Sequence, residues 1–196
     1  MPEPPAHHVH PLSAAEWRAW LEAHHEQEEG VWLVRYKTAT GKPTLSYDEQ
    51  VDEAMCFGWV DSTPKKIDAE RSARYFAPRK VGSGWSRVNK ERVQRMTEAG
   101  LMRPAGQALI DAAKADGSWT LLDAVENLEV PDDLAAALAR HPGAAAYFDA
   151  FPRSAKRGIL EWIVQAKREA TRAKRIEETA ELAARNERAN SWPRAK

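Results

Sequence analysis

Three short stretches in the first half of the chain carry the residue pattern of β-strands. Residues 31–37, 59–67 and 73–79 are rich in β-branched and aromatic side chains and are separated by turn residues. We predict that they share one sheet and that the second and third form an antiparallel hairpin. Pro64 and Pro78 indicate sheet edges or strand ends, because proline cannot donate to a strand ladder.

Apolar residues at helical spacing predict one helix before the first of these strands and one after it. Ser13 and Glu16 begin one predicted helix, which Gly30 ends. A second capping box, Ser46 with Glu49, begins a helix over 46–57 that joins the first strand to the second. This connection favours a right-handed crossover if the two strands are parallel neighbours.

From Ser86 onward the hydrophobic pattern is helical throughout. Serine or proline at the predicted helix starts and glycine or proline at the ends divide this half into segments. We predict helices over 86–100, 104–117, 131–142, 143–150 and 154–188.

These elements predict an α+β fold in which a small sheet of about three strands packs on helices and is followed by a mainly helical C-terminal half. A length of 196 residues fits one domain. We place it at 12–188, with an α+β part over 12–100 and a helical part over 101–188. Residues 1–11 and 189–196 are predicted to be flexible tails.

Charge changes this picture only locally. The chain has 29 basic and 29 acidic side chains, so the broad positive field of many nucleic-acid or membrane-surface proteins is absent. Residues 62–95, however, hold ten basic and three acidic side chains. No apolar run approaches the roughly 20 residues of a membrane span, and no secretory signal is visible. We therefore predict a cytoplasmic protein without membrane insertion.

The cysteine and histidine residues do not have the spacing or surroundings of a metal site or a catalytic nucleophile. Cys56 is the single cysteine and lies among apolar neighbours, which favours a core position. His24 and His25 are adjacent rather than at the i, i+4 spacing of two metal ligands on a helix. We predict neither a metal site nor a cofactor.

The strongest candidate for binding is the connection after the third strand. Arg79 and Lys80 precede Gly82 and Gly84, and Ser86 begins a helix. Free backbone N–H groups at a helix start, beside two cations, can bind an anion. An ordinary hairpin-to-helix connection with solvated charges explains the same residues equally well.

A second set of polar residues is compatible with a catalytic function. Ser62 and Lys65 match the S-x-x-K pattern of acyl-transferring serine enzymes, and Asp61 could act as a general base. Pro64 and the strand context do not give the helical geometry that this chemistry uses. An ion pair of Asp61 with a nearby cation is the simpler interpretation.

Another basic stripe lies near the C-terminus. Arg168, Arg172 and Arg175 recur at one face of a helix, which usually means a solvated surface. We also predict that Arg79 and Lys80 face Arg168 and Arg172 across one cleft, because clustered like charges indicate an anionic ligand that offsets their repulsion.

Several segments together resemble a known family, the YdeI/OmpD-associated or bacteriocin-protection proteins. The segments are MCFGWVDSTPKKID, RYFAPRK, SGWSRVNKERV, MRPAGQALI and WIVQAKREATRAKRI, within residues 12–185. The resemblance implies a cytoplasmic bacterial α+β protein linked to protection against bacteriocins and antimicrobial peptides, and it implies no catalytic residues. Ala170 stands where the family usually has glutamate, which is shifted here to Glu169.

We therefore expect a stress- or bacteriocin-protection protein that binds an anionic small molecule or peptide in a basic, aromatic-lined cleft. The alternative is an enzyme using Asp61, Ser62 and Lys65; a nucleic-acid binder ranks last, and the sequence gives no oligomeric state. The candidate ligand-binding residues are Trp59, Asp61, Ser62, Lys65, Lys66, Arg74, Arg79, Lys80, Trp85, Ser86, Asn89, Arg168 and Arg172.

Overall fold

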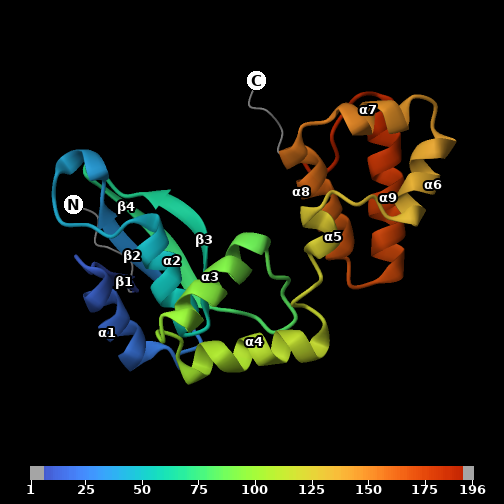
Figure 1. Ribbon diagram of the computed structural model, residues 1–196. Helices are drawn as coiled ribbons and strands as arrows, with labels where there is room; N and C mark the ends of the chain where they lie inside the picture. The colour runs from blue at the N-terminus through green and yellow to red at the C-terminus, as the bar shows by residue number, and fades with distance from the viewer. Residues whose placement is uncertain (1–6, 192–196) are drawn as a thin grey trace. The chain divides into compact units, whose positions relative to one another are not determined.

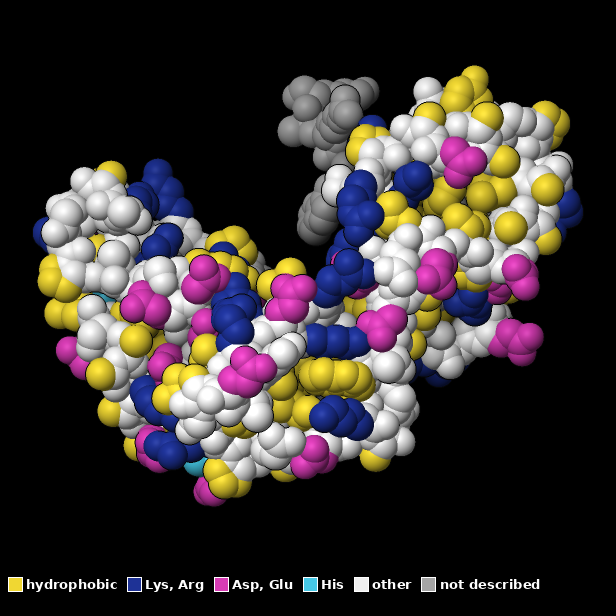
Figure 2. All heavy atoms as spheres, viewed as in Figure 1, with side chains coloured by type: hydrophobic (Ala, Val, Ile, Leu, Met, Phe, Trp, Pro, Cys, Tyr) yellow, Lys and Arg dark blue, Asp and Glu magenta, His cyan; other side chains and the backbone are white. Residues whose placement is uncertain are grey.

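The computed structural model describes residues 7–191, so the predictions for 1–6 and 192–196 lie outside the described residues. The chain folds into two compact units (Figure 1). A sheet-containing unit is formed by residues 7–83 and 88–117, and a helical unit by residues 84–87 and 118–191. Basic and acidic side chains are interspersed over the visible surface of each unit (Figure 2).

The sheet unit contains four strands in the order β1-β2-β4-β3. The strands are β1 (His8–Val9), β2 (Val31–Tyr36), β3 (Trp59–Lys66) and β4 (Arg71–Pro78). β1 runs parallel to β2, whereas β4 is antiparallel to both β2 and β3. The predicted α+β class and the antiparallel hairpin are confirmed, and Pro64 and Pro78 lie on the edge strand and at a strand end.

Three of the four helices of this unit, α2, α3 and α4, follow the predicted boundaries closely. They are α1 (Ala14–His24), α2 (Tyr47–Cys56), α3 (Arg87–Glu98), whose first residue belongs to the helical unit, and α4 (Pro104–Asp116); a 3-10 turn, η1, spans Thr38–Thr40. The capping box at Ser46 and Glu49 is present, and Gly58 has a left-handed φ of 79°. Trp17 on α1 packs edge-on against Phe76 of β4, so α1 lies on the same sheet face as Leu33 and Phe76.

Two predictions for this unit need correction, and the condition of a third is not met. The sheet has a fourth strand, β1, in a segment predicted to be a tail, because the backbone of His8 and Val9 pairs with β2. α1 ends at His24, well before Gly30. β2 and β3 are not neighbours, because β4 lies between them, so the crossover rule for adjacent parallel strands does not apply.

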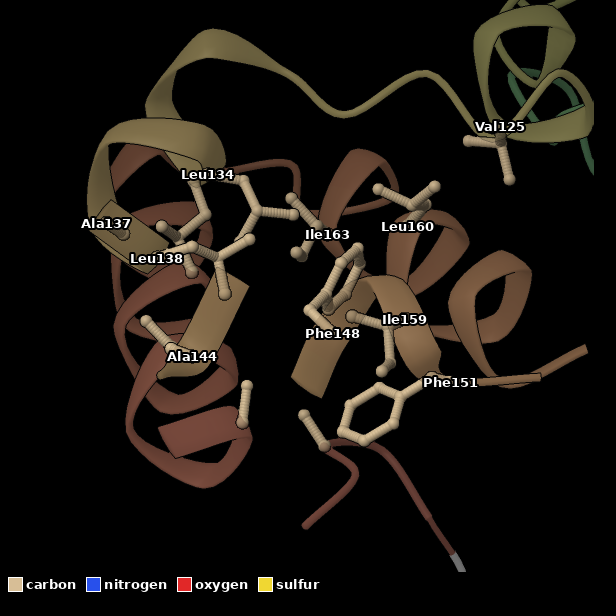
Figure 3. Packing of buried hydrophobic residues seen from close by; sticks show 14 of the residues in the cluster. Val125, Leu134, Ala137, Leu138, Ala144, Phe148, Phe151, Ile159, Leu160 and Ile163 are labelled. Carbon is tan, nitrogen blue, oxygen red and sulfur yellow. The ribbon is translucent and has the colours of Figure 1, made fainter. Parts of the chain in front are cut away.

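The helical unit contains α5 (Asp123–Glu126), α6 (Asp132–Arg140), α7 (Ala144–Ala150), α8 (Arg153–Val164) and α9 (Glu169–Ala184). Its core gathers around Phe148, which lies between Ile159, Ile163 and Leu138 (Figure 3). The continuous helix predicted over 154–188 is wrong, because the chain leaves helical geometry at residues 166–168 and restarts as α9. The short α5 was not predicted, because its four residues are too few to show a period.

Candidate anion-binding pocket

A pocket of about 150 Å³ lies between the N-terminal half of α2 and the sheet. Tyr47 and Gln50 come from α2, and the sheet contributes the remaining residues, which are Arg35, Pro64, Ser72, Ala73 and Arg74. The strand pairs Arg35–Ser72 and Pro64–Arg74 place these four side chains on one face, since directly paired residues point to the same side. That face also carries Leu33, which is completely buried.

Arg74 is fixed by a carboxylate at the edge of the pocket. Its Nη1 donates to Asp61 Oδ2 at 2.8 Å and to the Ser62 carbonyl oxygen at 3.1 Å. A β-bulge between Asp61 and Pro64 shifts the register of β3 against β4 at this point. Asp61 therefore forms an ion pair with Arg74 and neutralises its charge.

Arg35 is held differently. Its Nη1 donates to the carbonyl oxygen of Leu45 at 3.3 Å, and it forms no ion pair with any of residues 7–191. A carbonyl oxygen carries no formal charge, so the guanidinium charge of Arg35 is not neutralised by a carboxylate. The pocket side chains Arg35 and Arg74, together with Asp61, carry a net charge of +1.

Tyr47 connects the pocket to a second charged cluster. The guanidinium carbon of Arg74 lies 4.7 Å from the Tyr47 ring centre, and that of Arg92 lies 5.6 Å away. The Tyr47 hydroxyl donates to Asp61 Oδ2 at 3.3 Å. Burial, with Asp61 as the next contribution, raises the pKa of Tyr47, so the hydroxyl stays protonated and can donate at neutral pH.

Arg92 itself is 6% exposed and belongs to the framework behind the pocket. Its Nη1 donates to Asp52 Oδ1 at 2.5 Å, and its Nη2 donates to Asp48. Both carboxylates lie on α2, whereas Arg92 lies on α3. The pair of contacts fixes the helix that presents Tyr47 to the pocket.

The two adjacent lysines of β3 leave the sheet on opposite faces. Lys66 pairs with Ser72, so its side chain starts on the pocket face. Lys65 pairs with Ala73, and its ammonium lies 5.2 Å from the ring centre of Trp32 on the other face. Lys65 and Asp61 are therefore not brought together, and the residues of the enzyme alternative do not converge on one pocket.

Other predicted site residues are structural or lie elsewhere in the sheet unit. Trp59 is 2% exposed, and its Nε1 donates to the carbonyl oxygen of His25 at 3.0 Å. Arg79 is half-buried, and burial lowers its pKa to about 10, while Lys80 is exposed. Asn89 lies on α3 and is half-buried.

The remaining predicted residues belong to the helical unit. Trp85 is buried against Trp119, with ring centres 5.1 Å apart, and Ser86 follows it. Arg168 is exposed just before α9. Arg172 donates twice to the carboxylate of Asp133, at 2.8 and 3.0 Å, and this contact lowers the pKa of Asp133. The cleft shared by the two basic segments stays a prediction.

Of the residues predicted from the sequence, Arg74 lines the pocket and Asp61 pairs with it. The other polar lining residues were not among the predicted ones; they are Arg35, Tyr47, Gln50 and Ser72. A signal was present for Arg35, which lies in a strand that was predicted correctly. Ser72 belongs to β4 but lies just before residue 73, where that strand was predicted to begin. The register of the two strands was not available from the sequence, however. It is the register that brings Arg35 opposite Ser72 and under the N-terminal half of α2.

Two family models match the chain. Residues 9–109 match a family described as a domain of unknown function (DUF8412), and residues 127–186 match the family described as bacteriocin-protection, YdeI or OmpD-associated. The predicted resemblance is thus confirmed over 127–186, while the segments quoted from 55–68, 74–80 and 83–93 fall in the first match. No curated protein and no solved structure matched the chain. Among the described helices, none has the length and apolarity of a membrane span.

Proposed function

The chain belongs to the DUF8412 family and carries a YdeI/OmpD-associated domain, and on that premise we propose that it protects cells against bacteriocins by binding a small anion in the pocket of Arg35 and Arg74. The domain supports the protective role in general. The pocket lies in the DUF8412 part of the chain and supplies the binding chemistry. The two parts of the proposal are tested separately.

One observation carries the binding part: two guanidinium groups line a single pocket, and within residues 7–191 one carboxylate, that of Asp61, pairs with them. A planar guanidinium matches the geometry of carboxylate and phosphate groups, and it stays charged at every physiological pH. Asp61 occupies one side of Arg74, and Arg35 makes only a long bond to a carbonyl oxygen. An added anion would therefore gain two charge-assisted contacts.

The volume of the pocket limits the size of the ligand. An apolar cavity of about 150 Å³ in another protein holds a single benzene molecule. A phosphate, a carboxylate group or one acidic side chain fits a space of this order, whereas a whole peptide does not. We propose a small anion, or the acidic group of a larger molecule whose remainder stays outside the pocket.

The protective role is tested by the survival of a host strain that lacks its own copy and expresses variants of this chain. Arg35→Gln removes the net positive charge of the pocket and keeps a polar side chain. We expect survival under bacteriocin challenge to be at least ten-fold lower with this variant than with the wild type. Arg185→Gln is the matched control, because Arg185 is exposed in the helical unit. If both variants protect equally at equal protein levels, protection does not depend on the pocket.

A further inference from the structure

The sheet face opposite the pocket presents a row of aromatic rings across three strands. Trp32 on β2 pairs directly with Tyr75 on β4, and their ring centres lie 5.2 Å apart. On the other side, His8 of β1 pairs with Trp32, and its ring lies nearly parallel, at 18° and 6.3 Å. Trp32 and Tyr75 are half-buried, so each residue is partly accessible to solvent.

A second aromatic group lies on the same face, four residues along β2. Tyr36 is half-buried and contacts the ring of His10 at 4.8 Å. At about 3.3 Å per residue, Tyr36 starts about 13 Å from Trp32 along the strand. Between the two groups lie Val34 and Ala73, whose small side chains are buried. The face is therefore an aromatic platform of Trp32, Tyr75 and Tyr36 over a small apolar floor.

Cations border this platform at both ends. The Lys65 ammonium lies 5.2 Å from the Trp32 ring centre, and the Lys42 ammonium lies 4.9 Å from that of Tyr36. Lys65 is exposed and forms no ion pair within residues 7–191. Lys42 pairs with Glu70 at 2.7 Å, but both side chains are about half exposed, so this pair is weak enough to exchange for another anion.

We propose that this face binds single-stranded nucleic acid. Flat rings on a sheet face stack on unpaired bases, and neighbouring lysines bind the phosphates; the same combination is used by other sheet proteins that bind single strands. A base that stacks on Trp32 displaces the Lys65 ammonium from the ring, and the ammonium then pairs with the adjacent phosphate. The zero net charge of the chain means that no broad positive field attracts the nucleic acid, so the binding depends on the two lysines beside the platform.

A carbohydrate also stacks on aromatic rings, but it is neutral and gains nothing from Lys65 and Lys42. The lysines therefore favour a polyanion over a sugar. The difference is measurable, because binding to phosphates weakens steeply with salt, whereas stacking on a neutral ligand does not.

The test is fluorescence anisotropy with the full chain and labelled oligo(dT) and oligo(U) of twelve nucleotides, at 50 and 200 mM salt. We expect saturable binding that weakens with salt. Lys65→Gln should weaken binding several-fold and reduce the salt slope by about 0.7, the value for one phosphate contact on a single strand. Lys66→Gln is the matched control, because the neighbouring lysine starts on the opposite face.

The ring itself is tested by a pair of substitutions at one position. Trp32→Leu should weaken binding roughly five-fold to one hundred-fold, as expected for the loss of one stacked base. Trp32→Phe should keep most of the affinity, because it retains a flat ring, and melting curves of both variants check the fold. The proposal is overturned if no oligonucleotide binds, if Lys66→Gln weakens binding as much as Lys65→Gln, or if a neutral oligosaccharide binds as tightly.

Discussion

Cys56 shows how burial decides the chemistry of a single residue. Its side chain is completely buried, and burial raises its pKa to about 11 from an ordinary value of 9.0. The thiolate is the nucleophilic form, so the folded protein holds the unreactive thiol at neutral pH. The interpretation of Cys56 as a core residue agrees with this environment.

The same shift predicts a dependence of stability on pH. The unfolded thiol loses its proton near pH 9 and the folded one near pH 11, so the unfolded state binds fewer protons between these values. The free energy of unfolding of the wild type should fall over this range by more than that of Cys56→Ala. Urea denaturation of both proteins at pH 8.5 and 10.5 measures the difference. Parallel losses in the two proteins would contradict it.

Helix packing in the sheet unit depends on close approach of α4 to the end of α2. A Cβ atom on Gly106 would lie 2.4 Å from the carbonyl oxygen of Cys56, and backbone cannot move aside as a side chain can. Gly158 of α8 has nothing within 4 Å of the same position. The two helical glycines therefore have opposite roles.

Alanine at these two positions should change stability in opposite directions. Gly106→Ala should lower the free energy of unfolding by about 1–3 kcal/mol, as overpacking does. Gly158→Ala should raise it by about 0.5–1 kcal/mol, because alanine loses less backbone entropy in a helix. Urea denaturation gives both values, and a stable Gly106→Ala protein would show that α4 can shift without cost.

The junction of α2 and α3 gives a second prediction about elements. Arg92 is buried between Asp48 and Asp52, so Arg92→Met leaves the less exposed carboxylate, Asp52, with only its outer partner Arg95. We expect a loss of about 3 kcal/mol, in the range measured for removing one partner of a buried pair. Arg95→Met should cost less than about 1 kcal/mol, because the Arg95 side chain is 53% exposed. Similar losses in chemical denaturation would rule out this role for Arg92.

At the scale of the molecule, residues 84–87 belong to the helical unit although both sequence neighbours belong to the sheet unit. Trp85 packs on Trp119, and Gly84 faces Leu122. Trp85→Ala should therefore speed amide hydrogen exchange in α5 and leave α2 unchanged, whereas Trp17→Ala should do the reverse. Faster amide exchange in α2 of the Trp85→Ala variant would contradict this assignment, because it would show that Trp85 stabilises the sheet unit.

The sequence predicted the elements well because capping residues, glycines and β-branched runs act locally. The expected geometry is present at the capping box of Ser46. It is also present at both ends of α4, where Pro104 begins the helix and Gly117 follows its end. The fourth strand could not be predicted, because His8 and Val9 are a strand only through pairing with β2. Arg35 was missed for the same reason, since long-range register places it beside Arg74.

The proposed function depends most on an anion that binds between Arg35 and Arg74. Its most direct test is the melting temperature in a titration with inorganic phosphate at low and high ionic strength, for the wild type and Arg35→Gln. Binding to the folded state should raise the melting temperature of the wild type with increasing phosphate, and more at low ionic strength. Arg35→Gln should lose this increase, and Lys65→Gln should keep it. A phosphate response of Arg35→Gln equal to that of the wild type would contradict the proposed site.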